Sequence, residues 1–326
     1  MKVTKEMMDL ELWLRGRLMD LLLKKSTEEA FLRSMKRRKK LFRLMEGKKL
    51  RGFVKEVHHL ERSKGAPLRL CLYKPKEPQG LLPGILWLHG GGYAQGAPEM
   101  NHALYQSLME KEPCVIVAPA YTLSTEAPYP AALEDAHLAL LYMKTHAKDL
   151  GIRDDQLMVG GESAGGGLAA ALTLYTRDLG SVHIAFQMPL YPMLDDRMDT
   201  NSMKDNDAPI WDAKTNAMAW KLYLGPYHRE KVPPYAAPLR AENYQGLPPA
   251  LTYVGDLDPF YDETLGYMKH LEEAGVPVQL KVVKGAYHGF DRVDPKGALS
   301  REAQAFFLTG FSYAVKNHVH PQNPSP

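Results

Sequence analysis

The sequence has few of the features that mark secreted, membrane-spanning or nucleic-acid-binding proteins. It contains only 2 cysteines in 326 residues, Cys71 and Cys114, which is too few for a disulfide framework. Both lie in apolar stretches, so we expect buried free thiols in a reducing compartment. The 41 basic and 38 acidic side chains leave a formal charge of +3, which argues against a nucleic-acid-binding surface spread over the whole protein.

Long apolar runs are missing as well. No segment is long and apolar enough to span a bilayer, so we expect no membrane insertion. The best apolar run near the N-terminus, Leu18 to Leu23, is interrupted by Asp20 and is followed by charged residues rather than by a small-residue cleavage site. We therefore predict a cytoplasmic protein.

Motifs that hold a cofactor or a metal ion are also missing. The glycine-rich stretch His89-Gly90-Gly91-Gly92 lacks the Lys and the Ser or Thr of a phosphate-binding loop. No Gly-x-Gly-x-x-Gly follows the first predicted strand, and no spacing of histidines and carboxylates is typical of zinc ligands. We therefore expect no cofactor and no metal.

The first 50 residues are predicted to be helical. Apolar residues at helical spacing indicate an amphipathic helix, namely Leu10, Trp13, Leu14, Leu18, Leu21 and Leu22. A second helix is expected from about Thr27 to Met45. It contains the basic run Lys36 to Lys40, which we interpret as a solvated helix face because no aromatic residues interleave with it.

From about Gly52 onward, short β-prone runs alternate with helical ones. The expected strands are Phe53 to Leu60, Leu68 to Tyr73, Ile85 to Leu88, Val115 to Ala118, Leu157 to Val159, Ile184 to Phe186, Leu251 to Val254 and Val278 to Val283. The first two form an opening pair, and the alternation predicts a mostly parallel sheet in an α/β fold, with helices on both faces and a site at the carboxyl ends of the strands. Residues from about 195 to 238 are too irregular for a simple connection and indicate an insertion. The tail 321–326 is expected to be disordered.

Ser163 lies in Gly161-Glu162-Ser163-Ala164-Gly165, directly after a predicted strand and before a run of small residues. This pattern has the form of a nucleophile elbow, a strained turn between a strand and a helix that exposes the serine Oγ. The pattern is short, and by itself it leaves open the alternative of a glycine-rich helix start with no chemical role.

A serine hydroxyl becomes a good nucleophile only when a base accepts its proton and a third group orients that base. His288 follows a predicted strand, at the same rim of the sheet as Ser163. The other histidines after Ser163 are His183, His228, His270, His318 and His320. Asp256, Asp258 and Asp262 follow another predicted strand, and their spacing does not choose among them. The three glycines after His89 offer N–H groups to a developing negative charge.

Taken together, four motifs resemble those of the hormone-sensitive-lipase-like family of α/β-hydrolases, also called bacterial lipase/esterase family IV. They are His89-Gly90-Gly91-Gly92, the Gly-Glu-Ser-Ala-Gly-Gly run, Asp258-Pro259 and His288-Gly289-Phe290. The resemblance covers about Lys74 to Phe311. It implies an α/β-hydrolase domain over residues 51–320, with residues 1–50 as cap helices and a further cap insertion around 195–238.

The resemblance also implies the roles of single residues. The family pattern makes Ser163 the nucleophile, His288 the general base and Asp258 the orienting acid. It assigns the oxyanion hole to the N–H groups of Gly91, Gly92 and Ala164, with His89, Gly90 and Glu162 as supporting residues of the motifs. Glu162 is a departure, because many relatives have Asp there.

The implied activity is that of a serine carboxylesterase acting on short-chain acyl esters. A deacetylase or amidase acting on acetylated sugars or small amides is an alternative, and a ligand-binding protein without turnover is a more remote one. The run Val278 to Val283 is β-prone enough to pair across a two-fold axis, which suggests a homodimer.

Overall fold

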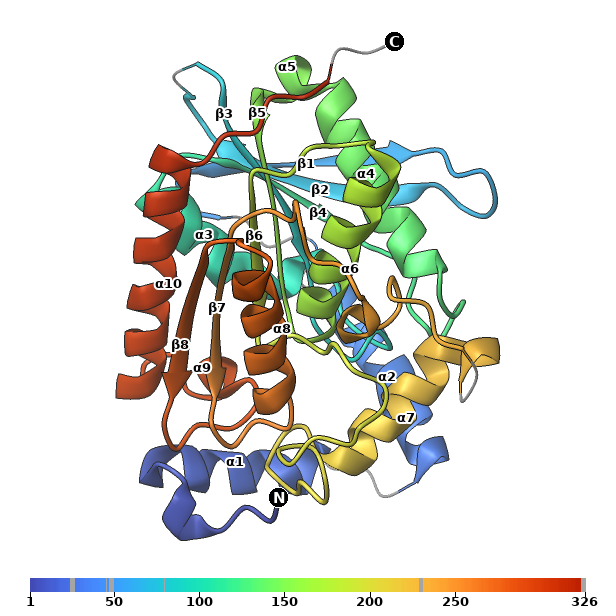
Figure 1. Ribbon diagram of the computed structural model, residues 1–326, viewed down its shortest axis with the longest axis vertical. Helices are drawn as coiled ribbons and strands as arrows, with labels where there is room; N and C mark the ends of the chain where they lie inside the picture. The colour runs from blue at the N-terminus through green and yellow to red at the C-terminus, as the bar shows by residue number, and fades with distance from the viewer. Residues whose placement is uncertain (24–26, 45, 47–49, 79, 229–230, 324–326) are drawn as a thin grey trace.

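The computed structural model describes all residues except 24–26, 45, 47–49, 79, 229–230 and 324–326 (Figure 1). Its centre is an eight-stranded sheet in the order β1-β2-β4-β3-β5-β6-β7-β8. The strands are β1 (Phe53–Leu60), β2 (Leu68–Pro75), β3 (Leu82–Leu88), β4 (Val115–Pro119), β5 (Ile152–Glu162), β6 (Phe186–Leu190), β7 (Ala250–Gly255) and β8 (Val278–Val283). Strand β2 pairs antiparallel with β1 and β4, and the other pairs are parallel. The predicted opening pair and mostly parallel sheet are confirmed.

Helices cover both faces of this sheet. The α-helices of the described residues are α1 (Leu10–Leu23), α2 (Glu28–Arg43), α3 (His102–Lys111), α4 (Ala131–Thr145), α5 (Ala147–Leu150), α6 (Ala164–Leu179), α7 (Ala213–Leu224), α8 (Tyr261–Glu273), α9 (Phe290–Val293) and α10 (Ala298–Asn317). Helices α4, α6 and α8 lie on one face, and α3 and α10 lie on the other (Figure 1).

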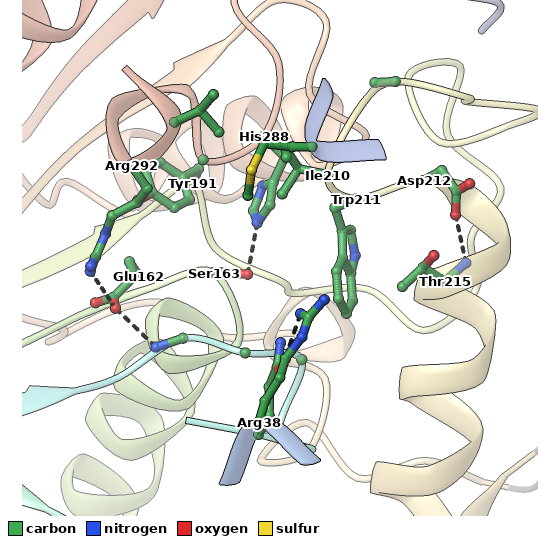
Figure 2. Close-up of a pocket in the computed structure, with 18 of the residues that line it drawn as sticks. Arg38, Glu162, Ser163, Tyr191, Ile210, Trp211, Asp212, Thr215, His288 and Arg292 are labelled. Atoms are coloured by element: carbon green, nitrogen blue, oxygen red, sulfur yellow. Dashed lines mark hydrogen bonds and ion pairs between the residues drawn. The ribbon is translucent and has the colours of Figure 1, made fainter. Parts of the chain in front are cut away.

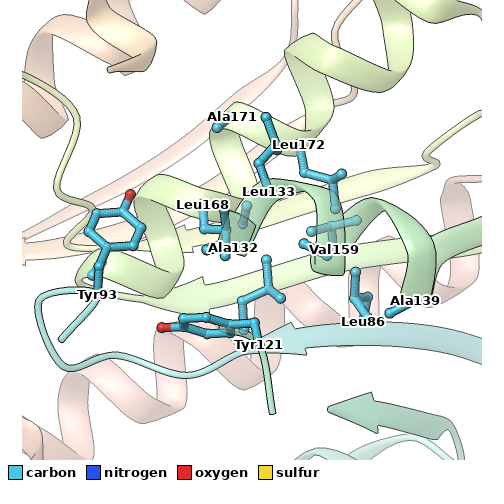
Figure 3. Close-up of a cluster of buried hydrophobic side chains, with 14 of the residues drawn as sticks. Leu86, Tyr93, Tyr121, Ala132, Leu133, Ala139, Val159, Leu168, Ala171 and Leu172 are labelled. Carbon is cyan, nitrogen blue, oxygen red and sulfur yellow. The ribbon is translucent and has the colours of Figure 1, made fainter. Parts of the chain in front are cut away.

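Residues of the central strands alternate between the two layers because successive side chains of a strand point to opposite faces. Leu86 of β3 belongs to the buried cluster with Leu168 and Leu172 of α6 (Figure 3). Its neighbour Trp87 points the other way and meets Phe307 of α10 edge-on, with ring centroids 6.2 Å apart. Both faces of β3 are therefore buried, which explains its continuous apolar sequence.

One predicted strand is misplaced. The sequence predicts a strand over Ile184 to Phe186, but β6 begins at Phe186 and continues to Leu190. The polar Gln187 obscured this pattern. Its side chain is fully buried because its amide donates to the Pro248 carbonyl at 2.9 Å and accepts from the Tyr267 hydroxyl at 2.8 Å.

Helix α1 lies below the lower ends of β7 and β8, and α2 and α7 lie side by side at the lower right of the view (Figure 1). Helix α1 was expected, but the face that it buries was not. Leu10, Leu14 and Leu18 are 62%, 57% and 63% exposed, whereas Leu12 is 2% exposed. The side chains of Leu21 and Leu22 lie outside the described residues.

Helix α1 approaches the domain through Gly16 instead. A Cβ at Gly16 would lie 2.8 Å from the Tyr287 hydroxyl and 2.9 Å from the Pro209 side chain. The Tyr287 hydroxyl also donates to the Leu12 carbonyl at 2.9 Å. Because glycine lets the helix come this close, the face that carries Leu12 and Gly16 packs against the domain, and the face that carries Leu10, Leu14 and Leu18 does not.

Helix α2 begins after Thr27, whose hydroxyl caps it by accepting the Ala30 N–H at 3.2 Å. Within its basic run, Arg37 is exposed as predicted, but Arg38 is turned toward a cavity. The side chains of the three lysines in this run lie outside the described residues, as does Met45.

Residues 321–323 differ from the disordered tail that was expected. Gln322 pairs with both backbone groups of His183, accepting its N–H at 2.9 Å and donating to its carbonyl at 2.7 Å. These two hydrogen bonds attach the tail to the segment before β6, and residues 324–326 lie outside the described residues. Both cysteines are buried free thiols, as predicted.

Candidate active site

Ser163 occupies the sharp turn between β5 and α6, with φ 59° and ψ −122°. A residue other than glycine seldom adopts a positive φ, so this turn is strained. A Cβ at Gly161 would lie 2.4 Å from the Gly165 carbonyl oxygen, and one at Gly165 would lie 2.1 Å from the Leu88 carbonyl oxygen. The two flanking positions therefore have room only for glycine. This is the geometry of a nucleophile elbow and not of an ordinary glycine-rich helix start.

The structure brings Ser163, His288 and Asp258 together in one hydrogen-bonded chain. His288 Nδ1 lies 2.7 Å from Asp258 Oδ2, and His288 Nε2 lies 2.8 Å from Ser163 Oγ (Figure 2 shows the second of these bonds). Because an ionised carboxylate only accepts, Nδ1 carries the proton and Nε2 is left to accept the serine hydroxyl. The three side chains come from the carboxyl ends of β5, β7 and β8, as the parallel sheet predicted.

The other two aspartates left open by spacing have different partners. Asp256 Oδ1 accepts the Gly285 N–H at 2.7 Å, and Asp262 Oδ2 accepts the Ser202 N–H at 2.7 Å. Asp258 is 1% exposed and also accepts the Phe260 N–H at 2.8 Å through Oδ1. Both of its oxygens are therefore engaged in a water-poor environment, which fixes the carboxylate that orients His288.

The glycine loop after β3 lies beside this chain. Gly91 and Gly92 both have positive φ, at 124° and 61°. Within the described part of the chain, no acceptor is hydrogen-bonded to the N–H groups of Gly91, Gly92 or Ala164. Such unengaged N–H groups can stabilise the negative oxygen of a tetrahedral intermediate.

The side chain of His89, which precedes the glycine loop, is buried. Burial lowers its pKa to about 4, so its ring is neutral near neutral pH. Its Nδ1 donates to the Gly90 carbonyl at 2.9 Å, and its ring stacks on Tyr121 at 4.2 Å between centroids. The Tyr121 hydroxyl also donates to the His89 carbonyl at 2.7 Å. His89 thus holds the loop and lies apart from the serine–histidine pair.

Glu162 joins the elbow to the glycine loop. Its carboxylate accepts the Gly90 N–H at 3.0 Å, the Trp87 indole N–H at 2.8 Å and the Asn101 amide at 2.8 Å. It also forms an ion pair of 2.8 Å with Arg292 (Figure 2). The residue before Ser163 therefore contacts both the end of β3 and α9.

A cavity of about 380 Å³ opens above Ser163. Its wall comes from several separate parts of the sequence. The lining residues include Met19, Phe31, Met35 and Arg38 of the N-terminal helices, Gly91, Gly92 and Gln95 of the glycine loop, and Ile210, Trp211 and Asp212 of the insertion (Figure 2).

Sequence reasoning did not assign Arg38, Tyr191 or Trp211 to the site. For Arg38 a signal was available, because Phe31, Met35 and Arg38 are spaced by four and three residues and so share one face of a helix. Phe31 and Met35 are buried, which places Arg38 on the inward face with them. Tyr191 directly follows β6 and so stands at the carboxyl end of a strand, whereas Trp211 lies in an irregular segment without a periodic pattern.

Comparison with known proteins agrees with this geometry. A family model described as α/β hydrolase fold matches residues 85–292. The chain is 35% identical to esterase LipI of Mycobacterium tuberculosis over 69% of this chain and 71% of that protein. It is 31% identical to an ethyl acetate hydrolase of Pseudomonas putida over 73% of this chain and 75% of that protein.

Solved structures give the same result. A bacterial heroin esterase superposes with a TM-score of 0.88 at 32% identity, covering 96% of this chain and 99% of that one. Esterase LipW of Mycobacterium marinum gives 0.83 at 29% identity, covering 95% and 96%. In the residues that the structure describes, no helix combines the length and apolar character that a bilayer span requires. The chain therefore belongs to the α/β-hydrolase family matched here, the hormone-sensitive-lipase-like family of serine hydrolases that its motifs resemble.

Proposed function

We propose that the protein is a serine carboxylesterase in which Ser163 is the nucleophile, His288 the general base and Asp258 the orienting acid. The observation that carries this proposal is the unbroken chain of hydrogen bonds from Asp258 through His288 to Ser163, at 2.7 and 2.8 Å. The esterase relatives support the ester as the bond that is broken.

In the proposed reaction, Ser163 Oγ attacks the ester carbonyl carbon while its proton passes to His288 Nε2. The carbonyl oxygen becomes negative and is stabilised by the N–H groups of Gly91, Gly92 and Ala164. The C–O bond to the alcohol breaks, and His288 returns the proton to the leaving alkoxide. Water then attacks the acyl-enzyme through the same base, releasing the acid and restoring Ser163.

We further propose short acyl chains as substrates. The cavity of about 380 Å³ is small and carries large side chains such as Phe31 and Trp211. Helices α1 and α2, together with the insertion around 195–238, act as a cap in this proposal, since all of them contribute to the cavity wall. A relative named for ethyl acetate supports a small acyl group.

The test is hydrolysis of p-nitrophenyl esters of increasing acyl length by the wild type and by Ser163→Ala. We expect Ser163→Ala to lose turnover by a factor of about 10⁴ or more, and kcat/KM to be highest for short chains. Ser107→Ala is a matched control, because Ser107 lies on α3 and outside the lining of the cavity. Near-wild-type activity of Ser163→Ala would refute the assignment, and a steady rise toward long-chain triglycerides would refute the chain length.

A matched ester and amide pair separates the proposal from the amidase and deacetylase alternatives. We expect the ester to be hydrolysed faster than the amide of the same acid. A higher kcat/KM for the amide or for an acetylated sugar would favour those alternatives. Absence of turnover on all of them would favour the ligand-binding alternative.

We also propose a cytoplasmic location and self-association through β8. The two buried free thiols support a reducing compartment. Strand β8 lies at the edge of the sheet, and its Val282 is 40% exposed. Cell fractionation tests the cytoplasmic location. Light scattering of the wild type and of Val282→Lys tests the self-association. We expect a dimer for the wild type and a monomer for Val282→Lys, because a positive charge repeated across the two-fold axis should separate the subunits.

A further inference from the structure

Arg38 extends from α2 into the cavity, on the side of Trp211 (Figure 2). Its side chain is half-buried. Its only hydrogen bond among the described residues runs from Nη1 to the neutral Oε1 of Gln95, at 3.3 Å. A guanidinium has five N–H donors, so most of its hydrogen-bonding capacity is unused.

No carboxylate in the described part of the chain forms an ion pair with Arg38. Other partly buried arginines do have such partners: Arg62 lies 2.7 Å from Asp135, and Arg292 lies 2.8 Å from Glu162. Burial without a counter-ion lowers the pKa of Arg38. The guanidinium has therefore lost part of its hydration and has no anion beside it, which costs free energy. A bound anion would offset this cost.

The acidic residues of the cavity wall are engaged elsewhere. Glu162 holds Arg292. Asp212 accepts the Thr215 N–H at 2.7 Å as the cap of α7, and Asp20 accepts the Ile210 N–H at 3.1 Å. Each of these carboxylates thus has a structural role apart from Arg38.

The surroundings of Arg38 are suited to an amphipathic ligand. Phe31 and Met35 share its helix face, and Trp211 lines the same side of the cavity (Figure 2). A planar guanidinium matches the two oxygens of a carboxylate, and an apolar wall strengthens such a charge-assisted pair. Because Arg292 is already paired with Glu162, Arg38 offers a single positive charge, which favours a carboxylate over a doubly charged phosphate.

We propose that Arg38 forms an anion subsite in the cavity and that the preferred substrates are esters that also carry a carboxylate group. This rests on the proposed esterase function and narrows its substrate class. The ester carbonyl lies at Ser163 while the carboxylate binds Arg38, so the subsite selects substrates and takes no part in bond breaking.

Two substrate pairs test this, each matching an anionic ester with a neutral one of similar length. Monoethyl adipate against ethyl hexanoate places the carboxylate on the acyl side. The acetate ester of γ-hydroxybutyrate against butyl acetate places it on the alcohol side. Arg38→Gln should lower the anionic-to-neutral ratio of kcat/KM by about tenfold to a hundredfold in one of the pairs. Arg38→Lys should retain part of that ratio.

Arg37→Gln is the matched control, because Arg37 is the exposed neighbour on the same helix and the change in charge is identical. It should leave both ratios at the wild-type value. An Arg38→Gln variant with wild-type ratios in both pairs would overturn the proposal.

A binding measurement separates failure of this proposal from failure of the esterase function. Hexanoate should bind the wild type more tightly than Arg38→Gln by calorimetry, by about tenfold or more. If the wild type hydrolyses none of these esters while hexanoate binding still depends on Arg38, the esterase function fails and the subsite stands. If the esters are hydrolysed and hexanoate binds both forms equally, the subsite fails alone.

Discussion

The carboxylate of Glu162, the residue directly before Ser163, forms an ion pair of 2.8 Å with Arg292 of α9. The same carboxylate accepts the N–H of Gly90 at 3.0 Å. The turn at Ser163, the glycine loop and the segment after His288 are thus connected through one buried side chain. This explains how a residue longer than the Asp of many relatives is accommodated: its length is used to reach Arg292 and the indole of Trp87.

Replacing Glu162 should therefore disturb both folding and catalysis. Glu162→Gln removes the charge that Arg292 faces and replaces one of the two oxygens that accept from Gly90, Trp87 and Asn101 by an amide donor. Because Arg292 is 37% exposed, water compensates in part, and we expect a loss of about 2 kcal/mol in the free energy of unfolding. We expect kcat to fall about tenfold or more as the glycine loop shifts. Urea unfolding and steady-state kinetics measure the two effects.

The matched control is Glu110→Gln on the exposed surface of α3, where the carboxylate accepts from Gln106 at 2.7 Å. It should change neither quantity appreciably. A Glu162→Gln variant with wild-type kcat would show that the glycine loop does not depend on this carboxylate.

The three aspartates that sequence spacing could not separate can be separated by mutation. Asp258→Asn should lower kcat by about 10³- to 10⁴-fold, since an amide at this position favours the wrong tautomer of His288. Within the described residues, the side chains of Asp256 and Asp262 accept from backbone N–H groups away from His288, so we expect Asp256→Asn and Asp262→Asn to keep at least about a tenth of the activity. A larger loss from either of them than from Asp258→Asn would contradict the proposed triad.

We expect the free energy of unfolding to depend on pH through the buried carboxyl group of Glu263. Burial raises its pKa well above the ordinary value of 4.5, although Oε2 accepts the Leu194 and Asp195 N–H groups at 2.8 and 2.9 Å. The folded protein therefore holds this proton more tightly than the unfolded chain. The contribution of Glu263 to the free energy of unfolding is therefore largest below about pH 4.5, and it decreases as the pH rises toward the folded-state pKa.

Glutamine resembles the protonated carboxyl and does not titrate. The free energy of unfolding of the wild type, minus that of Glu263→Gln, should thus decrease as the pH rises above about 4.5. Urea unfolding at a series of pH values measures this difference, and Glu273→Gln at an exposed position of the same helix is the control. A difference that is constant with pH, or that increases, would contradict a raised pKa.

The sequence predicted the candidate site best at positions where only one type of residue can fit or react. Gly161 and Gly165 leave no space for a Cβ, and Ser163, Asp258 and His288 follow strands that end at one rim, so pattern and topology together predicted their proximity. The resemblance was still needed to choose Asp258. Spacing alone does not reveal which aspartate turns toward His288.

Packing between distant segments was beyond sequence reasoning. The leucines of α1 predicted an apolar buried face, yet Leu10, Leu14 and Leu18 are exposed. The helix orientation is decided by its fit against Tyr287 and Pro209, which are far away in the sequence. The inward position of Arg38 was likewise hidden in a run of basic residues that usually indicates a solvated surface.

The close packing at Gly16 predicts that replacing it by Ala lowers the stability of the protein, although helix propensity alone predicts an increase. In a helix interior, replacing Gly by Ala ordinarily stabilises a protein by about 0.5–1 kcal/mol. Gly266→Ala in α8 should do so, because the nearest atom to its new Cβ is 3.8 Å away. Gly16→Ala should instead destabilise by about 1–2 kcal/mol, since its Cβ would lie 2.8 Å from the Tyr287 hydroxyl.

Displacing α1 should also change the cavity, because Met19 lies one turn beyond Gly16 in its wall. We therefore expect Gly16→Ala to raise KM more than it lowers kcat, whereas Gly266→Ala should leave both near the wild-type values. Thermal unfolding and steady-state kinetics of the two variants measure these effects side by side. If Gly16→Ala were as stabilising as Gly266→Ala, the close approach of α1 to Tyr287 would not be what fixes the helix over the cavity.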